Sequence, residues 1–260
     1  MARIVAVANQ KGGVGKTTTA INLATSLALA DQRILLVDVD TQGNLTSGVG
    51  QKGKAAAAGT IYDALISPQP TTDPSPFLIP TGVDRMMLFP ADRQLTGAEI
   101  ELVTLPQREA RLRLLLTPLR SDFDYIFVDC PPSLGLLTLN ALVAADTVLI
   151  PLHCEYFALE GLAELVGTRR RVRAALNPAL EIEGVLLTMF DDRTNLGSQV
   201  ASDVRGFFKE KVFRTVIPRN VRLGEAPSHG MPAILYDVKS RGAAAYLALA
   251  REVLERRAAA

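Results

Sequence analysis

The sequence predicts an α/β fold, a mostly parallel, twisted sheet flanked by helices on both faces. Strand-length apolar runs alternate with helix-length segments along most of the 260 residues. The runs are apolar at nearly every position, which is typical of parallel strands that are buried on both faces. A glycine-rich turn follows the first run and acidic residues follow two others, at the end of the strands where such sheets bind ligands.

The predicted elements begin at the N-terminus. Residues 3–9 form a β-branched run, the turn KGGVGK follows, and the next segment, TTTAINLATSLALA, has helical propensity. Further strands are expected at residues 33–37, 86–89, 125–128, 147–152, 185–190 and 212–217. Helices are expected near residues 107–120, 134–144, 156–175 and 196–209. A last helix is expected at residues 242–257, with one apolar side formed by Leu247, Ala250, Val253 and Leu254.

The segment from Gly50 to Gly82 interrupts this alternation. It contains an alanine-rich stretch and prolines at positions 68, 70, 74, 76 and 80. We interpret it as a surface excursion around a short helix at residues 61–66, because predicted strands of one sheet lie on both sides of it. The sequence therefore predicts one domain over residues 1–260.

Composition excludes several classes of protein. Apolar residues make up 48% of the chain and charged residues 21%, close to the average of soluble globular proteins. No apolar run approaches the ~20 residues of a membrane-spanning helix, and the N-terminus lacks the shape of a secretory signal, so a cytoplasmic protein is expected. Cys130 and Cys154 are too few for a disulfide framework and lack the spacing of a zinc site, so both are expected to be buried thiols.

The charge of the chain is unevenly distributed. The formal net charge is only +1, which by itself favours no particular partner. The last hundred residues, however, carry 16 basic and 11 acidic side chains. This small excess makes the last hundred residues the more favourable part of the chain for contact with a polyanion, but by itself it gives only weak support.

The glycine-rich turn has the pattern of a Walker A phosphate-binding loop. In such a loop, backbone N–H groups and a helix N-terminus cradle phosphates, while a lysine reaches the terminal phosphates and a hydroxyl reaches Mg²⁺. Lys16 and Thr17 occupy those last two positions. Gln10 stands where the general motif has a glycine, and Lys11 adds a second lysine. The predicted loop comprises Lys11, Gly12, Gly13, Val14, Gly15, Lys16, Thr17 and Thr18.

Three carboxylates follow predicted strands and so point to the same edge of the sheet. Asp38 and Asp40 follow residues 33–37, and Asp129 follows residues 125–128. Asp129 matches the Walker B position, where a carboxylate holds the Mg²⁺ shell, usually through water. Each carboxylate is also a residue type that caps helices and turns, an alternative that the sequence leaves open.

These motifs together resemble those of the deviant-Walker ATPases and, within them, the ParA/Soj chromosome and plasmid partition proteins. Asp38-Val39-Asp40-Thr41-Gln42 is similar to the family motif D-x-D-x-Q, with Thr41 where many relatives carry proline. Further similar segments cover nearly the whole chain, at residues 129–133, 155–161, 188–191, 193–195 and 218–230. The resemblance implies a P-loop NTPase fold of the deviant Walker type, ATPase activity, and ATP and Mg²⁺ as cofactors.

The resemblance also implies roles for individual residues. The catalytic residues would be Lys11, Lys16 and Asp40, with Lys11 reaching the nucleotide of a partner subunit and Asp40 activating the attacking water. Thr17, Asp40 and Asp129 would hold the metal, and Asp38 would organise the loop or the Mg²⁺ shell. Pro218 and Asn220 lie in a segment similar to the one that contacts adenine in the family, although an ordinary turn is an alternative there.

Further expectations concern partners and location. In the family, arginines that match Arg193 and Arg222 bind double-stranded DNA without sequence preference. The resemblance implies an ATP-dependent homodimer, association with the nucleoid, and a ParB-type centromere-binding partner that stimulates hydrolysis. The cluster Arg169–Arg173 is a weaker candidate for DNA contact, because charges at this spacing usually form a solvated helix face.

Other members of the superfamily provide alternatives. A MinD-like ATPase would attach to a membrane surface through a terminal amphipathic helix, but the last predicted helix lacks bulky aromatics near its end and is expected to pack on the domain. Iron–sulfur relatives hold a cluster between subunits, and Cys130 and Cys154 do not fit their pattern. Small-molecule ligases need a substrate pocket that no motif in the sequence indicates.

Overall fold

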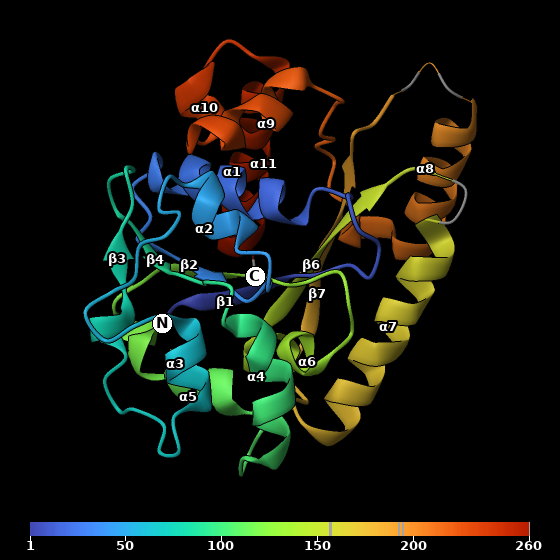
Figure 1. The fold of residues 1–260 in the computed structure, drawn as a ribbon. Helices are drawn as coiled ribbons and strands as arrows, with labels where there is room; N and C mark the ends of the chain where they lie inside the picture. Colours follow the sequence, from blue (N-terminus) through green and yellow to red (C-terminus); the bar gives the residue numbers. More distant parts are fainter. Residues whose placement is uncertain (156–157, 192, 194, 260) are drawn as a thin grey trace.

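The computed structural model describes residues 1–155, 158–191, 193 and 195–259. Within that part of the chain, seven strands form one sheet in the order β3-β4-β2-β5-β1-β6-β7 (Figure 1). All neighbouring strands run parallel except β3, which is antiparallel to β4. The strands are β1 (Arg3–Val7), β2 (Ile34–Asp38), β3 (Ile79–Pro80), β4 (Met86–Phe89), β5 (Tyr125–Asp129), β6 (Thr147–His153) and β7 (Glu181–Thr188).

Helices cover both faces of this sheet, as the sequence predicts. One face carries α1 (Lys16–Ala28), α2 (Asn44–Gly48), α9 (Val221–Glu225), α10 (Ala233–Tyr236) and α11 (Arg241–Ala258) (Figure 1). The other carries α3 (Ile61–Ile66), α4 (Leu95–Glu101), α5 (Arg111–Leu116), α6 (Leu136–Ala144), α7 (Ala158–Ala175) and α8 (Asn195–Phe208). The prediction of a mostly parallel sheet between two helical layers is therefore confirmed.

Alternate residues of each central strand supply the two hydrophobic cores. In β1, Ile4 and Ala6 lie in the core under α3–α8, whereas Val5 and Val7 lie in the core under α1 and α11. Because every second side chain of a strand points to the same face, a strand between two helical layers must be apolar throughout. This explains the continuous apolar runs that identify the strands in the sequence.

The excursion at residues 50–82 contains the expected helix and one unexpected strand. The helix α3 begins after Thr60, whose backbone N–H donates to Asp63 Oδ2 at 2.8 Å. The missed strand is β3, two residues that pair with β4 at the edge of the sheet. Pro80 is accommodated because an edge strand does not need every N–H for pairing.

The predicted strand at residues 212–217 is wrong, because the structure contains only isolated bridges there. Val212 bridges to Val185 of β7, and Pro218 bridges to Phe190. Between them, the backbone N–H groups of Arg214 and Thr215 donate to the Glu252 carboxylate of α11, at 2.9 Å each. Phe213 and Ile217 still donate to the Val185 and Leu187 carbonyls of β7, so the segment pairs with the sheet only in part.

Two helices also differ from the prediction. The segment 107–120 is divided into α5 and a 3-10 turn, Pro118–Ser121, since a proline cannot donate a backbone hydrogen bond in a helix interior. In α11 the buried side is formed by Tyr246, Leu249, Ala250 and Val253, whereas Leu247 is 38% exposed. The first two residues of the predicted helix 156–175, and Thr194 of a predicted motif, lie outside the described residues.

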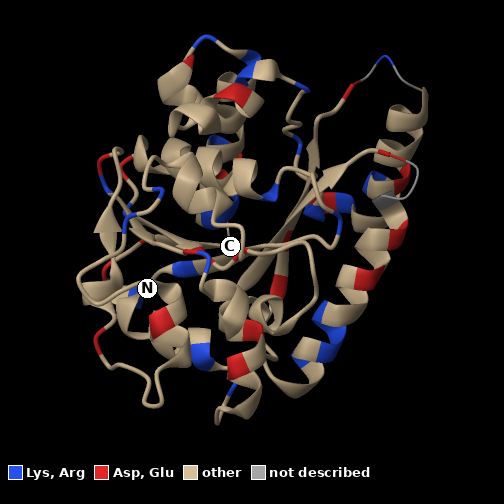
Figure 2. Cartoon of the chain, in the orientation of Figure 1, with Lys and Arg blue, Asp and Glu red and all other residues tan. Residues whose placement is uncertain are grey.

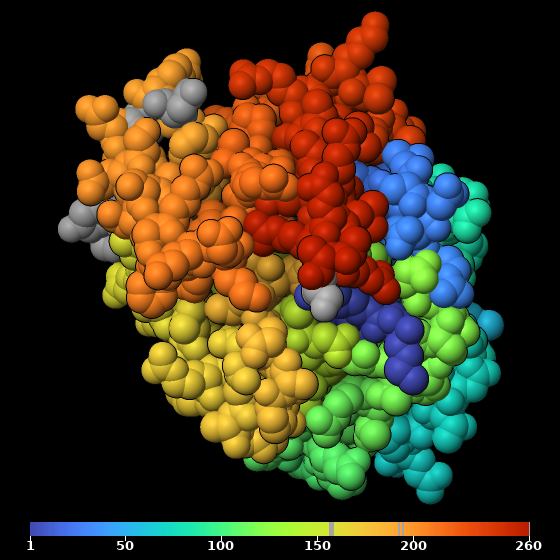
Figure 3. All heavy atoms as spheres, turned by 180° about the vertical axis from the view of Figure 1, so that it is seen from behind, coloured from blue at the N-terminus to red at the C-terminus, as the bar shows by residue number. Residues whose placement is uncertain are grey.

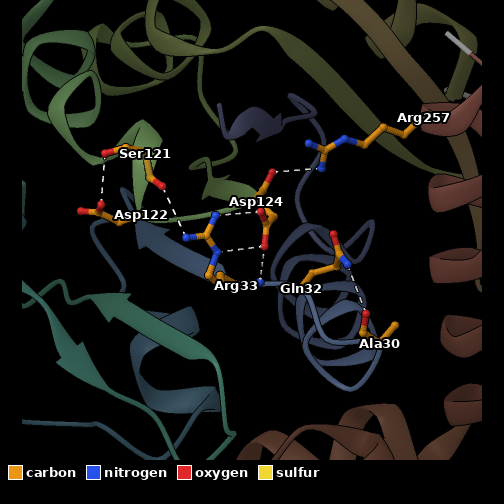
Figure 4. A network of polar contacts seen from close by, with 7 residues as sticks. All are labelled: Ala30, Gln32, Arg33, Ser121, Asp122, Asp124 and Arg257. Atoms are coloured by element: carbon orange, nitrogen blue, oxygen red, sulfur yellow. Dashed lines mark hydrogen bonds and ion pairs between the residues drawn. The ribbon is translucent and has the colours of Figure 1, made fainter.

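At the amino-terminal ends of β2 and β5, polar contacts connect the sheet to the end of α11. Asp124, just before β5, accepts hydrogen bonds from the backbone N–H and the guanidinium of Arg33, just before β2 (Figure 4). Arg257 of α11 donates to the backbone oxygen of Asp124 at 3.2 Å. These contacts join two central strands and the C-terminal helix.

Among the described residues, no helix has both the length and the hydropathy needed to traverse a lipid bilayer.

Candidate functional site

A cleft with a volume of about 510 Å³ lies at the carboxyl-terminal edge of the sheet, beside the N-terminus of α1. Pockets that bind small molecules have volumes of this order. The cleft brings together nine of the predicted site residues, which are Gly12, Gly13, Gly15, Lys16, Thr17, Thr18, Asp40, Pro218 and Asn220. These residues are far apart in the sequence, from the first loop to the region before α9, so the site forms only when the chain folds.

The backbone of the loop has the shape that a phosphate cradle requires. Gly13 and Gly15 adopt positive φ values of 71° and 88°, a region in which other residues are strained. Gly15 is the N-cap of α1 and has no side chain, so the first N–H groups of the helix face the cleft without a capping side chain. The hydroxyl of Thr188, at the end of β7, donates to the Val14 carbonyl at 2.8 Å and fixes the loop to the sheet.

Lys16 is positioned toward the interior of the loop. Its side chain is buried, and its Nζ donates to the Lys11 carbonyl at 3.2 Å. Burial lowers the pKa of Lys16, while the nearby Asp129 carboxylate acts in the opposite direction. An anion bound in the cleft would therefore interact with the Lys16 ammonium group, which is already largely removed from water.

Thr17 and Asp129 form the part of the site that suits a divalent cation. The Thr17 hydroxyl donates to Asp129 Oδ2 at 2.6 Å. Asp129 Oδ1 is buried and has no hydrogen-bond partner among the described residues. Burial and the neighbouring Asp38 raise the pKa of Asp129 well above its usual range, which is a cost that a bound cation would offset.

This donor set fits Mg²⁺ better than a transition metal. Within the described residues there is no cluster of three or more His, Cys, Asp or Glu side chains suited to holding a metal. Mg²⁺ does not need one, since it usually binds one or two protein oxygens and completes its shell with water and phosphate. Thr17, Asp129 and Asp40 are the residues here that could supply such oxygens.

Asp38 and Asp40 have different surroundings. Asp38 is fully buried and accepts from the backbone N–H and hydroxyl of Thr46 at 2.8 and 2.7 Å, and from the N–H of Asp40 at 3.2 Å. Burial raises the pKa of Asp38 to about 6. Asp40 instead lines the cleft, with its Oδ1 accepting from the Gln42 N–H at 3.0 Å. Asp38 thus organises the loop, and Asp40 is available to a ligand.

Lys11 lies at the rim of the site, held by an acidic residue. Its Nζ is 2.5 Å from Glu155 Oε2, and the other oxygen of Glu155 is 2.9 Å from Nδ1 of His153. The Lys11 side chain is 34% exposed and that of Glu155 is 48% exposed. Lys11 is therefore accessible from outside and is paired within its own chain.

The wall opposite the loop combines predicted and unpredicted residues. Asn220 caps α9 by accepting from the Arg222 N–H at 3.0 Å, so its amide oxygen is used locally and its amide NH₂ is the group suited to a ligand. Tyr246 of α11 also lines the cleft and lies 3.1 Å from the Thr19 hydroxyl of α1. Sequence reasoning missed Tyr246, because its helical position indicates only a buried face. It also missed Asn44. The remaining lining residues lie in or directly beside the segments similar to the family, but sequence reasoning assigned them no role of their own: Gln42, Pro132, Thr188, Met189, Ile217, Arg219, Leu223 and Gly224.

The two arginines predicted to bind DNA lie outside this cleft and carry acidic partners. Arg193 is 85% exposed and makes two hydrogen bonds to Asp191, at 2.8 and 2.6 Å, and this pairing lowers the pKa of Asp191 to about 2. Arg222 pairs with Glu225 at 2.7 Å and with Asp237 at 3.2 Å.

The cluster Arg169–Arg173 forms part of a mixed charged face. Arg169 and Arg173 both pair with Glu181, at 2.8 and 2.7 Å. Along α7, acidic residues lie toward the N-terminal half and basic residues toward the C-terminal half (Figure 2), an arrangement that complements the helix dipole. These contacts account for two of the four arginines of the cluster, Arg169 and Arg173.

Comparisons with known proteins agree with this arrangement. A family model described as an AAA domain matches residues 2–182. The chromosome partitioning protein ParA of Myxococcus xanthus is 58% identical, over 98% of this chain and 88% of the relative. The sporulation initiation inhibitor protein Soj of Bacillus subtilis is 56% identical, over 97% of this chain and 98% of the relative.

A solved structure also matches along the whole fold. It is that of a protein described as cobyrinic acid a,c-diamide synthase from Mycobacterium smegmatis, with bound ATP analog and magnesium. It is 38% identical, has a TM-score of 0.82, and covers 98% of this chain and 95% of that chain. The identity to ParA and Soj is higher and extends over nearly the full length. By these similarities and by its fold, the chain belongs to the ParA/Soj family of chromosome-partitioning proteins.

Proposed function

We propose that this chain is an ATP-dependent DNA-partitioning ATPase for a chromosome or plasmid, built as one domain over residues 1–260. Its cofactors are ATP and Mg²⁺. Binding of Mg-ATP joins two copies in a sandwich dimer, and the dimer binds double-stranded DNA without sequence preference, which associates it with the nucleoid. Slow hydrolysis, stimulated by a ParB-type partner, returns the protein to monomers.

One observation carries the ATPase part of the proposal. The glycine loop, Lys16, Thr17, Asp40 and Asp129 converge at one edge of the sheet, with a buried Asp129 oxygen that lacks a partner among the described residues. In this arrangement, loop N–H groups and Lys16 bind the phosphates, and Thr17 and Asp129 hold Mg²⁺. Mg²⁺ supplies neutralisation of the charge that develops on the phosphates. Asp40, which lines the cleft, would orient and deprotonate the attacking water.

The position of Lys11 supports the dimer part of the proposal. Its amine is at the accessible rim of the cleft and interacts with an exposed carboxylate. Exposed ion pairs contribute only ~0–1 kcal/mol, so the phosphates of a partner's nucleotide can replace Glu155 as the counter-ion of Lys11. Lys11 would then act in trans as an arginine finger does.

The proposed DNA binding rests on Arg193 and Arg222. Both are exposed, and both are held by carboxylates of their own chain that a DNA phosphate would have to displace. Two such arginines in one subunit provide little affinity, whereas the four in a dimer bind as a bivalent unit. DNA binding then depends on the nucleotide state through avidity.

The MinD-like alternative requires an apolar helix face that can enter a membrane surface. In α11, Tyr246, Leu249 and Val253 are instead buried in the core shared with α1. We therefore retain the DNA-partitioning proposal.

Sizing of the protein with ADP, with ATP, and with ATP plus a nonspecific duplex tests this proposal. We expect monomers with ADP, dimers with ATP and DNA-bound dimers in the third sample, and Lys16→Ala should abolish both changes because it loses nucleotide binding. If the protein hydrolyses ATP but stays monomeric and does not bind DNA, the result would instead indicate a small-molecule enzyme. Attachment of the ATP-bound protein to liposomes would favour the MinD-like alternative.

A further inference from the structure

The C-terminal helix α11 contacts the backbone segment that leads into the cleft, at Arg214 and Thr215. Glu252 of α11 is only 3% exposed, although it is an acidic residue. Its Oε1 accepts from the Arg214 N–H and its Oε2 from the Thr215 N–H, both at 2.9 Å. The Phe213 and Ile217 N–H groups, on either side, donate to the Val185 and Leu187 carbonyls of β7 at 3.0 and 2.9 Å, whereas the two donors between them are held by the Glu252 carboxylate. Charge-assisted hydrogen bonds of this kind are stronger than neutral ones.

Arg256, one turn further along α11, completes this contact. Its Nη2 donates to Glu252 Oε1 at 2.7 Å and to the Val212 carbonyl at 2.9 Å. Its guanidinium lies 4.3 Å from the ring centroid of Phe213. A buried carboxylate is stable only when it is paired and hydrogen-bonded, and Glu252 meets both conditions here.

The fixed segment continues directly into the wall of the cleft. After Thr215, the Ile217 N–H donates to the Leu187 carbonyl of β7 at 2.9 Å, and Ile217, Pro218 and Asn220 then line the cleft. On the back of the molecule, the C-terminal helix, red, lies against the orange region that contains this segment (Figure 3). Glu252 therefore anchors the strand-like segment two residues before the cleft lining begins.

The same helix also reaches the phosphate side of the cleft. Tyr246, less than two turns before Glu252, contacts the Thr19 hydroxyl of α1 at 3.1 Å. The helix thus contacts both the element that begins with the phosphate loop and the segment that forms the opposite wall.

We infer that Glu252 is a positioning residue, which sets the contribution of the nucleobase to ATP binding by fixing the wall formed by Ile217, Pro218 and Asn220. This inference rests on the proposed ATP site and goes beyond it by assigning the base-side wall to a residue of the C-terminal helix. Glu252 itself does not line the cleft.

The variant Glu252→Gln tests this role with a minimal change in shape. Its amide NH₂ would face one of the two backbone N–H donors, so one hydrogen bond is lost and two donors oppose each other. The matched control is Glu255→Gln, because Glu255 is 55% exposed and pairs with the Arg214 guanidinium at 2.8 Å rather than with the backbone. Affinities for Mg-ATP and for Mg-tripolyphosphate, which has phosphates and no base, are measured by calorimetry for each protein.

We expect Glu252→Gln to weaken ATP binding about tenfold, equivalent to ~1.4 kcal/mol, with tripolyphosphate binding unchanged. Glu255→Gln should match the wild type with both ligands. An equal loss for both ligands, or no loss for either, would overturn the inference while leaving the proposed ATP site intact. Wild-type protein that binds neither ligand would overturn both. If Glu252→Gln does not fold, Glu252→Asp is measured in the same titrations, with the same selective loss expected because the shorter side chain cannot reach both donors.

Discussion

Lys11 combines a position in the phosphate loop with an acidic partner from a distant part of the chain. Glu155 follows β6, and it contacts both Lys11 and His153. An accessible cation held by an exposed carboxylate can change partners at small cost. In the dimer that we propose, Lys11 would exchange its counter-ion, from Glu155 of the same subunit to the phosphates of the other.

Removal of the Glu155 charge should favour the dimer. We expect Glu155→Gln to lower the protein concentration needed for ATP-dependent dimers by up to about fivefold, because an exposed ion pair contributes ~0.2–1 kcal/mol. Analytical ultracentrifugation with a slowly hydrolysed ATP analogue measures this. Glu160→Gln, which makes the same charge change on α7, should leave dimer formation unaltered. A dimer weakened by Glu155→Gln would mean that Glu155 serves the interface itself.

Asp40 should be needed for hydrolysis and not for dimer formation. We expect Asp40→Ala to reduce phosphate release about a hundredfold or more, as loss of a general base commonly does. The ATP-bound dimer should persist, since Lys11, Lys16 and the loop are unchanged. Phosphate release and sizing on the same sample provide both measurements. If Asp40→Ala released phosphate at the wild-type rate, Asp40 would not be the general base.

Among the secondary-structure elements, the carboxyl-terminal ends of β5 and β6 carry buried ionisable side chains. Asp129 and Cys130 lie together at the end of β5, and Cys154 follows β6. Both cysteines are buried and neither is in a disulfide, as the sequence predicts. Burial raises the pKa of both thiols, to about 11 for Cys154, because the thiolate is disfavoured away from water.

The raised pKa values predict slow thiol chemistry in the folded protein. At pH 8 both cysteines should remain protonated and should not react with Ellman's reagent on the timescale of minutes. Two equivalents should react after unfolding in guanidinium chloride, since the chain has two cysteines. The reaction becomes faster in the folded state only as the pH approaches the raised values. Rapid labelling of the native protein at pH 8 would show that one strand end is open to solvent.

At the scale of the whole molecule, charge is nearly balanced. With a net charge of +1, the monomer has no overall field that would hold DNA, and its candidate arginines are paired with carboxylates. Phosphate contacts release counter-ions, so binding weakens with salt in proportion to the number of contacts. If the dimer binds DNA as we propose, the salt dependence of that binding would report how many arginines it contributes.

The double variant Arg193→Ala and Arg222→Ala should dimerise with ATP and lose retention of DNA in a gel. Partial variants should reduce the slope of log K against log salt by ~0.9 for each phosphate contact removed. The double variant Arg170→Ala and Arg171→Ala removes the same charge from α7 and should retain DNA. DNA retention by the Arg193→Ala and Arg222→Ala variant would show that these two arginines are not required. Loss of DNA retention by the Arg170→Ala and Arg171→Ala variant would place the DNA-binding surface on α7.

The alternation of strands and helices, the glycine loop and the carboxylates at the strand ends could all be predicted from the amino-acid sequence. These features follow from local patterns, since a strand buried on both faces must be apolar throughout and a phosphate cradle needs glycine at Gly13 and Gly15. Three contacts depend on packing between distant segments: Glu155 holds Lys11, Tyr246 lines the cleft, and Glu252 accepts from the Arg214 and Thr215 N–H groups. Periodicity gives the buried face of an element and not the distant group that it meets, because that group is chosen by how the elements pack.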